Sequence, residues 1–188
     1  MADPLIFAAP DAFEAWLLKH GQTETELPLR LAKKGARDPT LNYAQALDVA
    51  LCHGWIDGVK RPDSDEHFIQ RFTPRKALSP WSKINRDKAE ALIKSGQMRE
   101  GGLAAIAQAK ANGKWDKAYA GSASIAVPDD LAAALKSNTA ANAFFKKLDR
   151  QNRYAILYRI GTVKKAETRA RKIAQFVTML AKGEKLYP

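Results

Sequence analysis

The sequence has little cysteine and no recognisable metal-binding or nucleotide-binding motif. Cys52 is the only cysteine among the 188 residues, which excludes an intramolecular disulfide and any zinc or iron–sulfur site built from several cysteines. The histidines, at positions 20, 53 and 67, lie too far apart for a local metal motif. No HExxH, phosphate-binding loop or strand–GxGxxG–helix pattern occurs. We therefore expect no bound metal and no cofactor.

The sequence also lacks long apolar runs. No stretch of 18 apolar residues is present, so no membrane span is expected. The first nine residues lack the basic start and the apolar core of a signal peptide. These absences predict a cytoplasmic protein.

A lone cysteine on an apolar stripe usually packs as a small hydrophobic residue, which is what we expect of Cys52.

What the sequence does contain is enough apolar surface for a core and an excess of positive charge. Hydrophobic residues make up 46% of the chain and charged residues 27%, which excludes a disordered or collagen-like chain. Lys and Arg number 31 against 20 Asp and Glu, a formal net charge of +11. Residues 1–120 carry 18 basic and 15 acidic residues, whereas residues 121–188 carry 13 and 5. Anionic partners therefore deserve consideration, above all for the last third.

Residues 1–120 predict a small α+β domain. A strand is expected near 27–31, and turn residues at 62–65 between the extended runs 55–60 and 67–73 predict an antiparallel hairpin. Helices are expected from an Asp11 cap to Gly21, over 43–52 with Tyr43 on its apolar stripe, from a Ser79 cap to Gly96, and over 103–111 after a Gly101-Gly102 loop.

The last third predicts helices alone, and a small-residue segment at 120–124 precedes it. The apolar spacing indicates helices over 129–136, 140–148, 150–160 and 165–182. We therefore expect a domain boundary near residue 120: an α+β domain over 1–120, with a small antiparallel sheet and packed helices, followed by a helical C-terminal module over 121–188.

Polar and aromatic residues are dense between positions 54 and 85. In a hairpin, Asp57 can pair with Arg71 or Arg75, and Arg guanidinium groups hold anions through paired hydrogen bonds. The functional interpretation is a pocket in which arginines bind an anionic group while indole rings stack on a planar one. The alternative is a structural network that fastens the hairpin to a helix. The residues concerned are Trp55, Asp57, Arg71, Arg75, Trp81, Ser82 and Asn85.

A second candidate site lies in the basic C-terminal helices, where cationic side chains of the kind that follow phosphates are concentrated. The alternative is a solvated helix face. The candidate residues are Lys164, Lys165, Arg169, Arg171 and Lys172.

Several sequence blocks resemble the bacterial YdeI/OmpD-associated family, also called bacteriocin-protection proteins. They are YAQAL (43–47), ALCHGWIDG (50–58), RFTPR (71–75), WSKIN (81–85), GKW (113–115), VPDDL (127–131) and KAETRARKI (165–173). The resemblance extends from about Phe13 to Gly183. It implies a link to envelope stress and tolerance of cationic antimicrobial peptides, with no established reaction or catalytic residues.

The sequence thus predicts a non-enzymatic binding or stress-associated protein with an unknown anionic small molecule or a protein as partner. Two alternatives stay open: a nucleic-acid-binding accessory protein that uses the basic tail, and an uncharacterised enzyme with a dispersed site.

Overall fold

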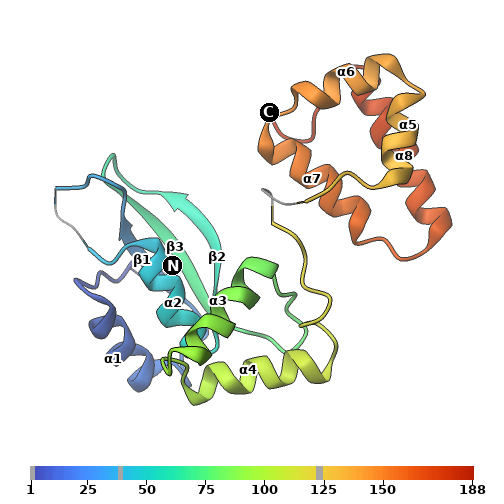
Figure 1. Ribbon diagram of the computed structural model, residues 1–188. Coiled ribbons are helices and arrows are strands. Elements are labelled where there is room, and N and C mark those ends of the chain that lie inside the picture. The colour runs from blue at the N-terminus through green and yellow to red at the C-terminus, as the bar shows by residue number, and fades with distance from the viewer. Residues whose placement is uncertain (1–2, 38–39, 122–124) are drawn as a thin grey trace. The chain divides into compact units, whose positions relative to one another are not determined.

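The computed structural model describes residues 3–37, 40–121 and 125–188, which divide into two compact units, Met1–Tyr119 and Ala120–Pro188. The N-terminal unit contains a three-stranded sheet and four helices, and the C-terminal unit contains four helices (Figure 1). The predicted α+β fold is confirmed. Part of the expected linker, residues 122–124, lies outside the described residues.

The sheet consists of β1 (Leu27–Ala32), β2 (Trp55–Pro62) and β3 (His67–Pro74), in the order β1-β3-β2 with antiparallel neighbours. The predicted hairpin is therefore correct. Asp57 lies opposite Phe72 and Lys60 lies opposite Gln70, with a register shift between Asp57 and Lys60. Such a bulge changes the local twist of the edge strand, and here it precedes Lys60.

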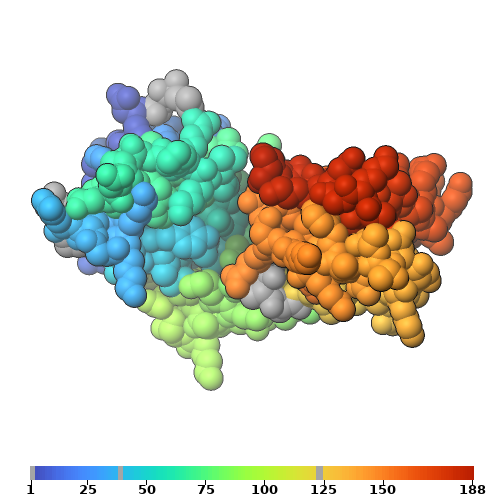
Figure 2. Space-filling view, turned by 90° about the horizontal axis from the view of Figure 1, so that it is seen from above, coloured from blue at the N-terminus to red at the C-terminus, as the bar shows by residue number. Residues whose placement is uncertain are grey.

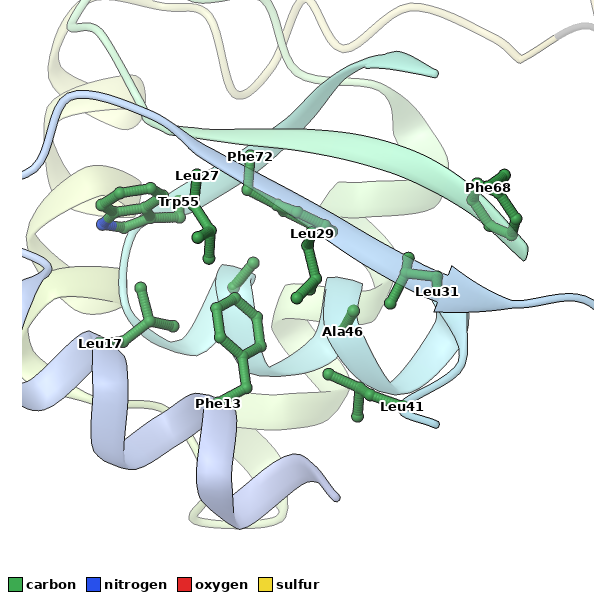
Figure 3. Close-up of a cluster of buried hydrophobic side chains, with 11 residues drawn as sticks. Phe13, Leu17, Leu27, Leu29, Leu31, Leu41, Ala46, Trp55, Phe68 and Phe72 are labelled. Carbon is green, nitrogen blue, oxygen red and sulfur yellow. The ribbon is translucent and has the colours of Figure 1, made fainter. Parts of the chain in front are cut away.

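One face of the sheet is covered by α1 (Pro10–His20) and α2 (Tyr43–Cys52). Phe13 and Leu17 of α1 point toward Leu27 and Leu29 of β1, with Phe72 beside them (Figure 3). These side chains are buried, so the contact between the helices and the sheet forms the first hydrophobic core.

The opposite face of α2 forms a second core with α3 (Lys83–Lys94) and α4 (Glu100–Ala111). Leu47 and Leu51 of α2 contact this core, whereas Ala46 and Ala50 belong to the first. Because α2 contributes to both cores, it is the central layer of the N-terminal unit.

Two predicted helix caps are wrong. Asp11 is not the N-cap of α1, which begins at Pro10 after Ala9, and Asp11 lies in the first turn. The third helix does not begin at Ser79-Pro80: Ser82 caps it and Lys83 is its first residue. The later start of the third helix is due to a contact between residues that are distant in sequence. The Tyr119 backbone forms hydrogen bonds with the backbones of Trp81 and Lys83, which hold residues 81 and 82 extended.

The Gly101-Gly102 pair is not a loop before α4 but part of its first turn. A Cβ on Gly102 would lie 2.4 Å from the carbonyl oxygen of Cys52, and one on Gly101 would lie 2.7 Å from that of His53. The Arg99 N–H also donates to the Cys52 carbonyl at 3.1 Å. The two glycines thus let the start of α4 contact the end of α2 directly.

The C-terminal unit has its own core. It comprises α5 (Asp129–Lys136), α6 (Thr139–Lys147), α7 (Arg150–Gly161) and α8 (Ala166–Ala181), in agreement with the predicted helices. Leu131, Phe145, Ile156 and Leu180 are buried together, one from each helix.

Candidate functional site

The two tryptophans expected to stack on a ligand lie in different cores. Trp55 is 2% exposed, belongs to the first core and donates from Nε1 to the Gly21 carbonyl at 3.2 Å. Trp81 is 3% exposed and belongs to the second core, where it meets Trp115 edge-on. Neither indole presents an open face to a ligand in this structure.

Asp57 and Arg71 lie on opposite faces of the sheet. Residues directly opposite each other in an antiparallel pair share a face of the sheet, so Asp57 lies on the same face as Phe72. Arg71 precedes Phe72 on β3, and successive residues of a strand point to opposite faces, so Arg71 lies on the other face. Arg71 instead lies 3.6 Å from a carboxylate oxygen of Glu26. The Asp57–Arg71 pair, one of the two expected pairings, therefore does not form.

Arg75 and Trp81 do come together. The Arg75 guanidinium lies over the Trp81 ring, and its Nη1 donates to the Pro80 carbonyl at 3.4 Å. Its Nε is buried and has no hydrogen-bond partner among the described residues. Burial lowers the pKa of Arg75 to about 10, although Tyr119 and Asp57 favour the charged form. Asp57 is thus near enough to influence Arg75, but it makes its hydrogen bond elsewhere.

The partner of Asp57 is Tyr43, whose hydroxyl donates to Oδ2 at 2.9 Å. Tyr43 begins α2 and is 39% exposed, so the expectation that its side chain packs in the core is wrong. Partial burial, followed by the charge and hydrogen bond of Asp57, raises the pKa of Tyr43. The phenol therefore stays protonated and remains a hydrogen-bond donor at neutral pH.

Ser82 and Asn85, the other two predicted ligand-binding residues, help to form the start of α3. The Ser82 hydroxyl accepts a hydrogen bond from the Asn85 N–H at 3.1 Å and so caps α3. This contact satisfies one of the free amides at the helix start. Ser82 and Asn85 thereby fix the end of the segment that carries Trp81.

The Tyr43–Asp57 pair lines a groove of about 890 Å³. The groove lies between the segment that follows β1, the start of α2, and the β2–β3 hairpin. Blue to cyan atoms of the first two segments lie beside the cyan-green atoms of the hairpin in the space-filling view (Figure 2). Its described lining residues are Ala32, Lys33, Lys34, Gly35, Ala36, Thr40, Asn42, Tyr43, Ala44, Asp57, Gly58, Lys60, Phe68 and Gln70.

Three lysines from two separate segments line this groove. Lys33 and Lys34 follow β1, and Lys60 follows the bulge in β2. The Lys33 ammonium donates to the Ser64 carbonyl at 2.7 Å, and the Lys60 ammonium lies 3.9 Å from the centre of the Phe68 ring. Among the described lining residues, Asp57 carries the one carboxylate. The groove therefore combines cations with one acceptor–donor pair, which suits an anion that also has a polar group.

Sequence reasoning missed Lys33, Lys34 and Lys60. Lys33-Lys34-Gly35 directly after a predicted strand was a usable signal, because basic pairs beside a glycine turn are exposed and near a sheet edge. Lys60 gave no such signal. Its place in the groove depends on the bulge, which the alternation of residues does not reveal.

The five basic residues of the tail differ in their exposure and in their contacts within the C-terminal unit. Arg169 donates to both oxygens of Asp130, at 2.6 and 3.0 Å, and to the Ile160 carbonyl at 2.8 Å. It is therefore engaged within the helical unit. The side chains of Lys164, Lys165 and Arg171 are exposed, and that of Lys172 is half-buried.

Other candidate chemistry is limited in the parts of the chain that the structure describes. Cys52 is buried, and burial raises the pKa of its thiol to about 11, so the thiol stays protonated at neutral pH. No group of three or more His, Cys, Asp or Glu side chains among residues 3–37, 40–121 and 125–188 is placed to hold a metal ion. Over the same residues, no helix has both the length and the apolar character that crossing a membrane requires.

Comparisons with known proteins divide the chain in the same way as its two units. Residues 124–183 match the family model described as "Bacteriocin-protection, YdeI or OmpD-Associated", the family that the sequence resembles. No curated protein matches the chain, and no solved structure does. Residues 5–105, which contain the whole groove, match the model described as "Domain of unknown function (DUF8412)". Because this match spans more than half of the 188 residues, the chain belongs to the DUF8412 family.

Proposed function

We propose that this protein is a binding protein whose N-terminal unit takes an anionic small molecule in the groove at the Tyr43–Asp57 pair. The observation that carries the proposal is the convergence of Lys33, Lys34 and Lys60 on one cavity of about 890 Å³. Small-molecule sites typically have volumes of about 300–1,000 Å³ and contain a few polar groups that fix the orientation of the ligand.

Charge assistance supports an anionic ligand. A lysine ammonium offers three donors and no acceptor, and hydrogen bonds between charged partners are about twice as strong as neutral ones. Three ammonium groups therefore favour phosphate, sulfate or carboxylate groups over neutral compounds.

The match of residues 124–183 supports a further step, namely that this binding serves bacteriocin protection. With a net charge of +11 the chain is a poor trap for cationic peptides. We infer that protection depends on the bound anion and not on capture of the peptide. Cytoplasmic location stays a prediction, and cell fractionation tests it.

Titration calorimetry with inorganic phosphate, sulfate and citrate tests the proposal, together with thermal shift assays. A ligand that binds only the native state raises the melting temperature, and at concentrations above Kd the stabilisation grows with the logarithm of the ligand concentration. The variant K33Q/K34Q/K60Q should weaken binding at least about tenfold, which corresponds to about 1.4 kcal/mol. The variant K83Q/K94Q/K117Q removes the same charge from exposed lysines outside the groove lining and should change Kd less than about twofold.

Two outcomes contradict the proposal. One is the absence of saturable binding by all three anions. The other is an equal loss of affinity in both triple variants, which would mean that net charge and not the groove attracts the anion.

A further inference from the structure

We propose that the ligand of the groove is a hydroxylated phosphate monoester, that is, a compound with a dianionic group at the lysines and hydroxyl groups at Asp57. This inference rests on the function proposed above and names the ligand class of the same site. It starts from the presence of the Asp57 carboxylate in a groove whose other charged side chains, among the described lining residues, are lysines.

Asp57 opposes binding of a simple anion. A carboxylate that faces an anionic ligand repels it, unless the ligand carries a donor that the carboxylate can accept. Tyr43 donates to Oδ2, but an ionised carboxylate has about four acceptor sites on its two oxygens. Asp57 therefore retains the capacity to accept further hydrogen bonds from a ligand.

A neutral hydroxyl suits Asp57 better than an ammonium group. The cation of Arg75 is near enough for Asp57 to favour its charged form, and Tyr43 already supplies one donor. The charge of Asp57 is thus partly balanced from within the protein. A ligand ammonium would therefore gain less electrostatic stabilisation beside Asp57 than beside an isolated carboxylate. A ligand hydroxyl needs only the free acceptor sites of Asp57.

The lysines and the groove volume set the other properties of the ligand. Three ammonium groups match a group with more than one negative charge, and phosphate monoesters carry nearly two near neutral pH. A cavity of about 890 Å³ holds a molecule considerably larger than inorganic phosphate. Space therefore remains for a hydroxylated carbon chain or ring between the lysines and Asp57.

Calorimetry with the full-length chain compares four phosphates: inorganic phosphate, methyl phosphate, glycerol 3-phosphate and glucose 6-phosphate. We expect at least one of the two hydroxylated esters to bind about tenfold or more tightly than methyl phosphate. A fifth compound, 2-aminoethyl phosphate, replaces the hydroxyl groups with an ammonium. It should bind more weakly than the better hydroxylated ester.

The variant Asp57→Asn gives a second readout, because its effects on the two classes of ligand have opposite signs. Methyl phosphate should bind more tightly to this variant, since the repulsion is gone. The hydroxylated ester should lose most of its advantage, to less than about threefold, since a neutral amide oxygen is a weaker acceptor. If Asp57→Asn fails to fold, Asp57→Ser replaces it, and the wild-type comparison decides the proposal without either variant.

Failure of this inference is distinguishable from failure of the proposed function. If all four phosphates bind the wild type equally and K33Q/K34Q/K60Q weakens them all, the ligand class is wrong and the anion site stands. Tighter binding of 2-aminoethyl phosphate than of either hydroxylated ester also overturns the hydroxyl assignment. If no phosphate and none of the other anions bind, both proposals are wrong.

Discussion

The guanidinium carbon of Arg75 lies 3.7 Å from the centre of the Trp81 ring, and this stack joins the end of β3 to the second hydrophobic core. The stack places a charged group against a buried indole. The Arg75 Nε has no partner among the described residues, and burial lowers the pKa of Arg75 to about 10. The fold therefore holds this cation against a desolvation cost.

The first prediction is that Arg75→Met leaves the protein as stable as the wild type or stabilises it. The substitution loses a cation–π contact worth about 0.5–2 kcal/mol and the long hydrogen bond from Nη1 to the Pro80 carbonyl, but it removes an unsatisfied buried donor that costs about 1–3 kcal/mol. Urea denaturation should show a free energy of unfolding that is unchanged or higher by about 1 kcal/mol. A loss above about 2 kcal/mol would show that Arg75 is mainly structural.

Local signals were enough to predict most helices and strands. The helix 43–52 and the hairpin were predicted correctly because apolar spacing and turn residues act within a few positions. The start of α3 was not, because Ser79-Pro80 is a good local signal that the backbone pairing of Tyr119 with Trp81 overrides. Contacts between residues distant in sequence are invisible to such patterns.

The site was predicted less well than the fold. The alternation of side chains along a strand correctly placed Trp55 and Asp57 on one face of β2. It could not decide which residues of β3 lie on that same face of the sheet, because this depends on the register. The register, with Asp57 opposite Phe72, separates Asp57 from Arg71. Lys33 and Lys34 follow β1, whereas Lys60 lies in β2, so no short segment of the sequence contains all three lysines. They line the same groove only because the three strands form one sheet.

The second prediction concerns the contact between α2 and α4. A Cβ at position 102 would lie 2.3 Å from the Met98 sulfur and 2.4 Å from the Cys52 carbonyl oxygen. Gly102→Ala should therefore destabilise the protein by about 1–3 kcal/mol through overpacking. Gly161→Ala is the matched control, since nothing lies within 4 Å of its added Cβ. It should stabilise by about 0.4–1 kcal/mol, and equal effects of the two changes in thermal denaturation would contradict the close approach.

The third prediction concerns Glu14, which joins α1 to the N-cap of α4, Arg99, and to the C-cap of α2, His53. Its Oε1 accepts from the Arg99 Nε at 2.8 Å and lies 3.4 Å from the His53 Nε2. Arg99 lowers the pKa of Glu14 below its ordinary value of 4.5. A carboxyl with a lowered pKa stabilises the fold above that ordinary value, and the contribution is lost as the pH falls through the lowered pKa.

Glu14→Gln should therefore lower the melting temperature at about pH 7, and the difference from the wild type should shrink as the pH approaches about 3. Glu90→Gln, an exposed substitution on α3, is the control and should leave the melting temperature almost unchanged at each pH. A constant difference between Glu14→Gln and the wild type across this range would mean that the charge of Glu14 is not involved.

The fourth prediction concerns Arg169, which links three helices of the C-terminal unit. It donates twice to Asp130 of α5 and once to the Ile160 carbonyl of α7. Arg169→Met removes all three hydrogen bonds and should destabilise this unit by about 1–2 kcal/mol. Arg171→Met, an exposed change on the same helix, should stay within about 0.5 kcal/mol.

Two optical signals can assign this loss to one unit, because all four tryptophans lie in the N-terminal unit, at positions 16, 55, 81 and 115. Tryptophan fluorescence thus reports unfolding of that unit, while circular dichroism reports the helices of both. Each unit has its own hydrophobic core, so we expect Arg169→Met to move part of the dichroism transition to lower urea and to leave the fluorescence midpoint in place. Equal shifts of both signals would contradict this expectation and show that the two units unfold as one.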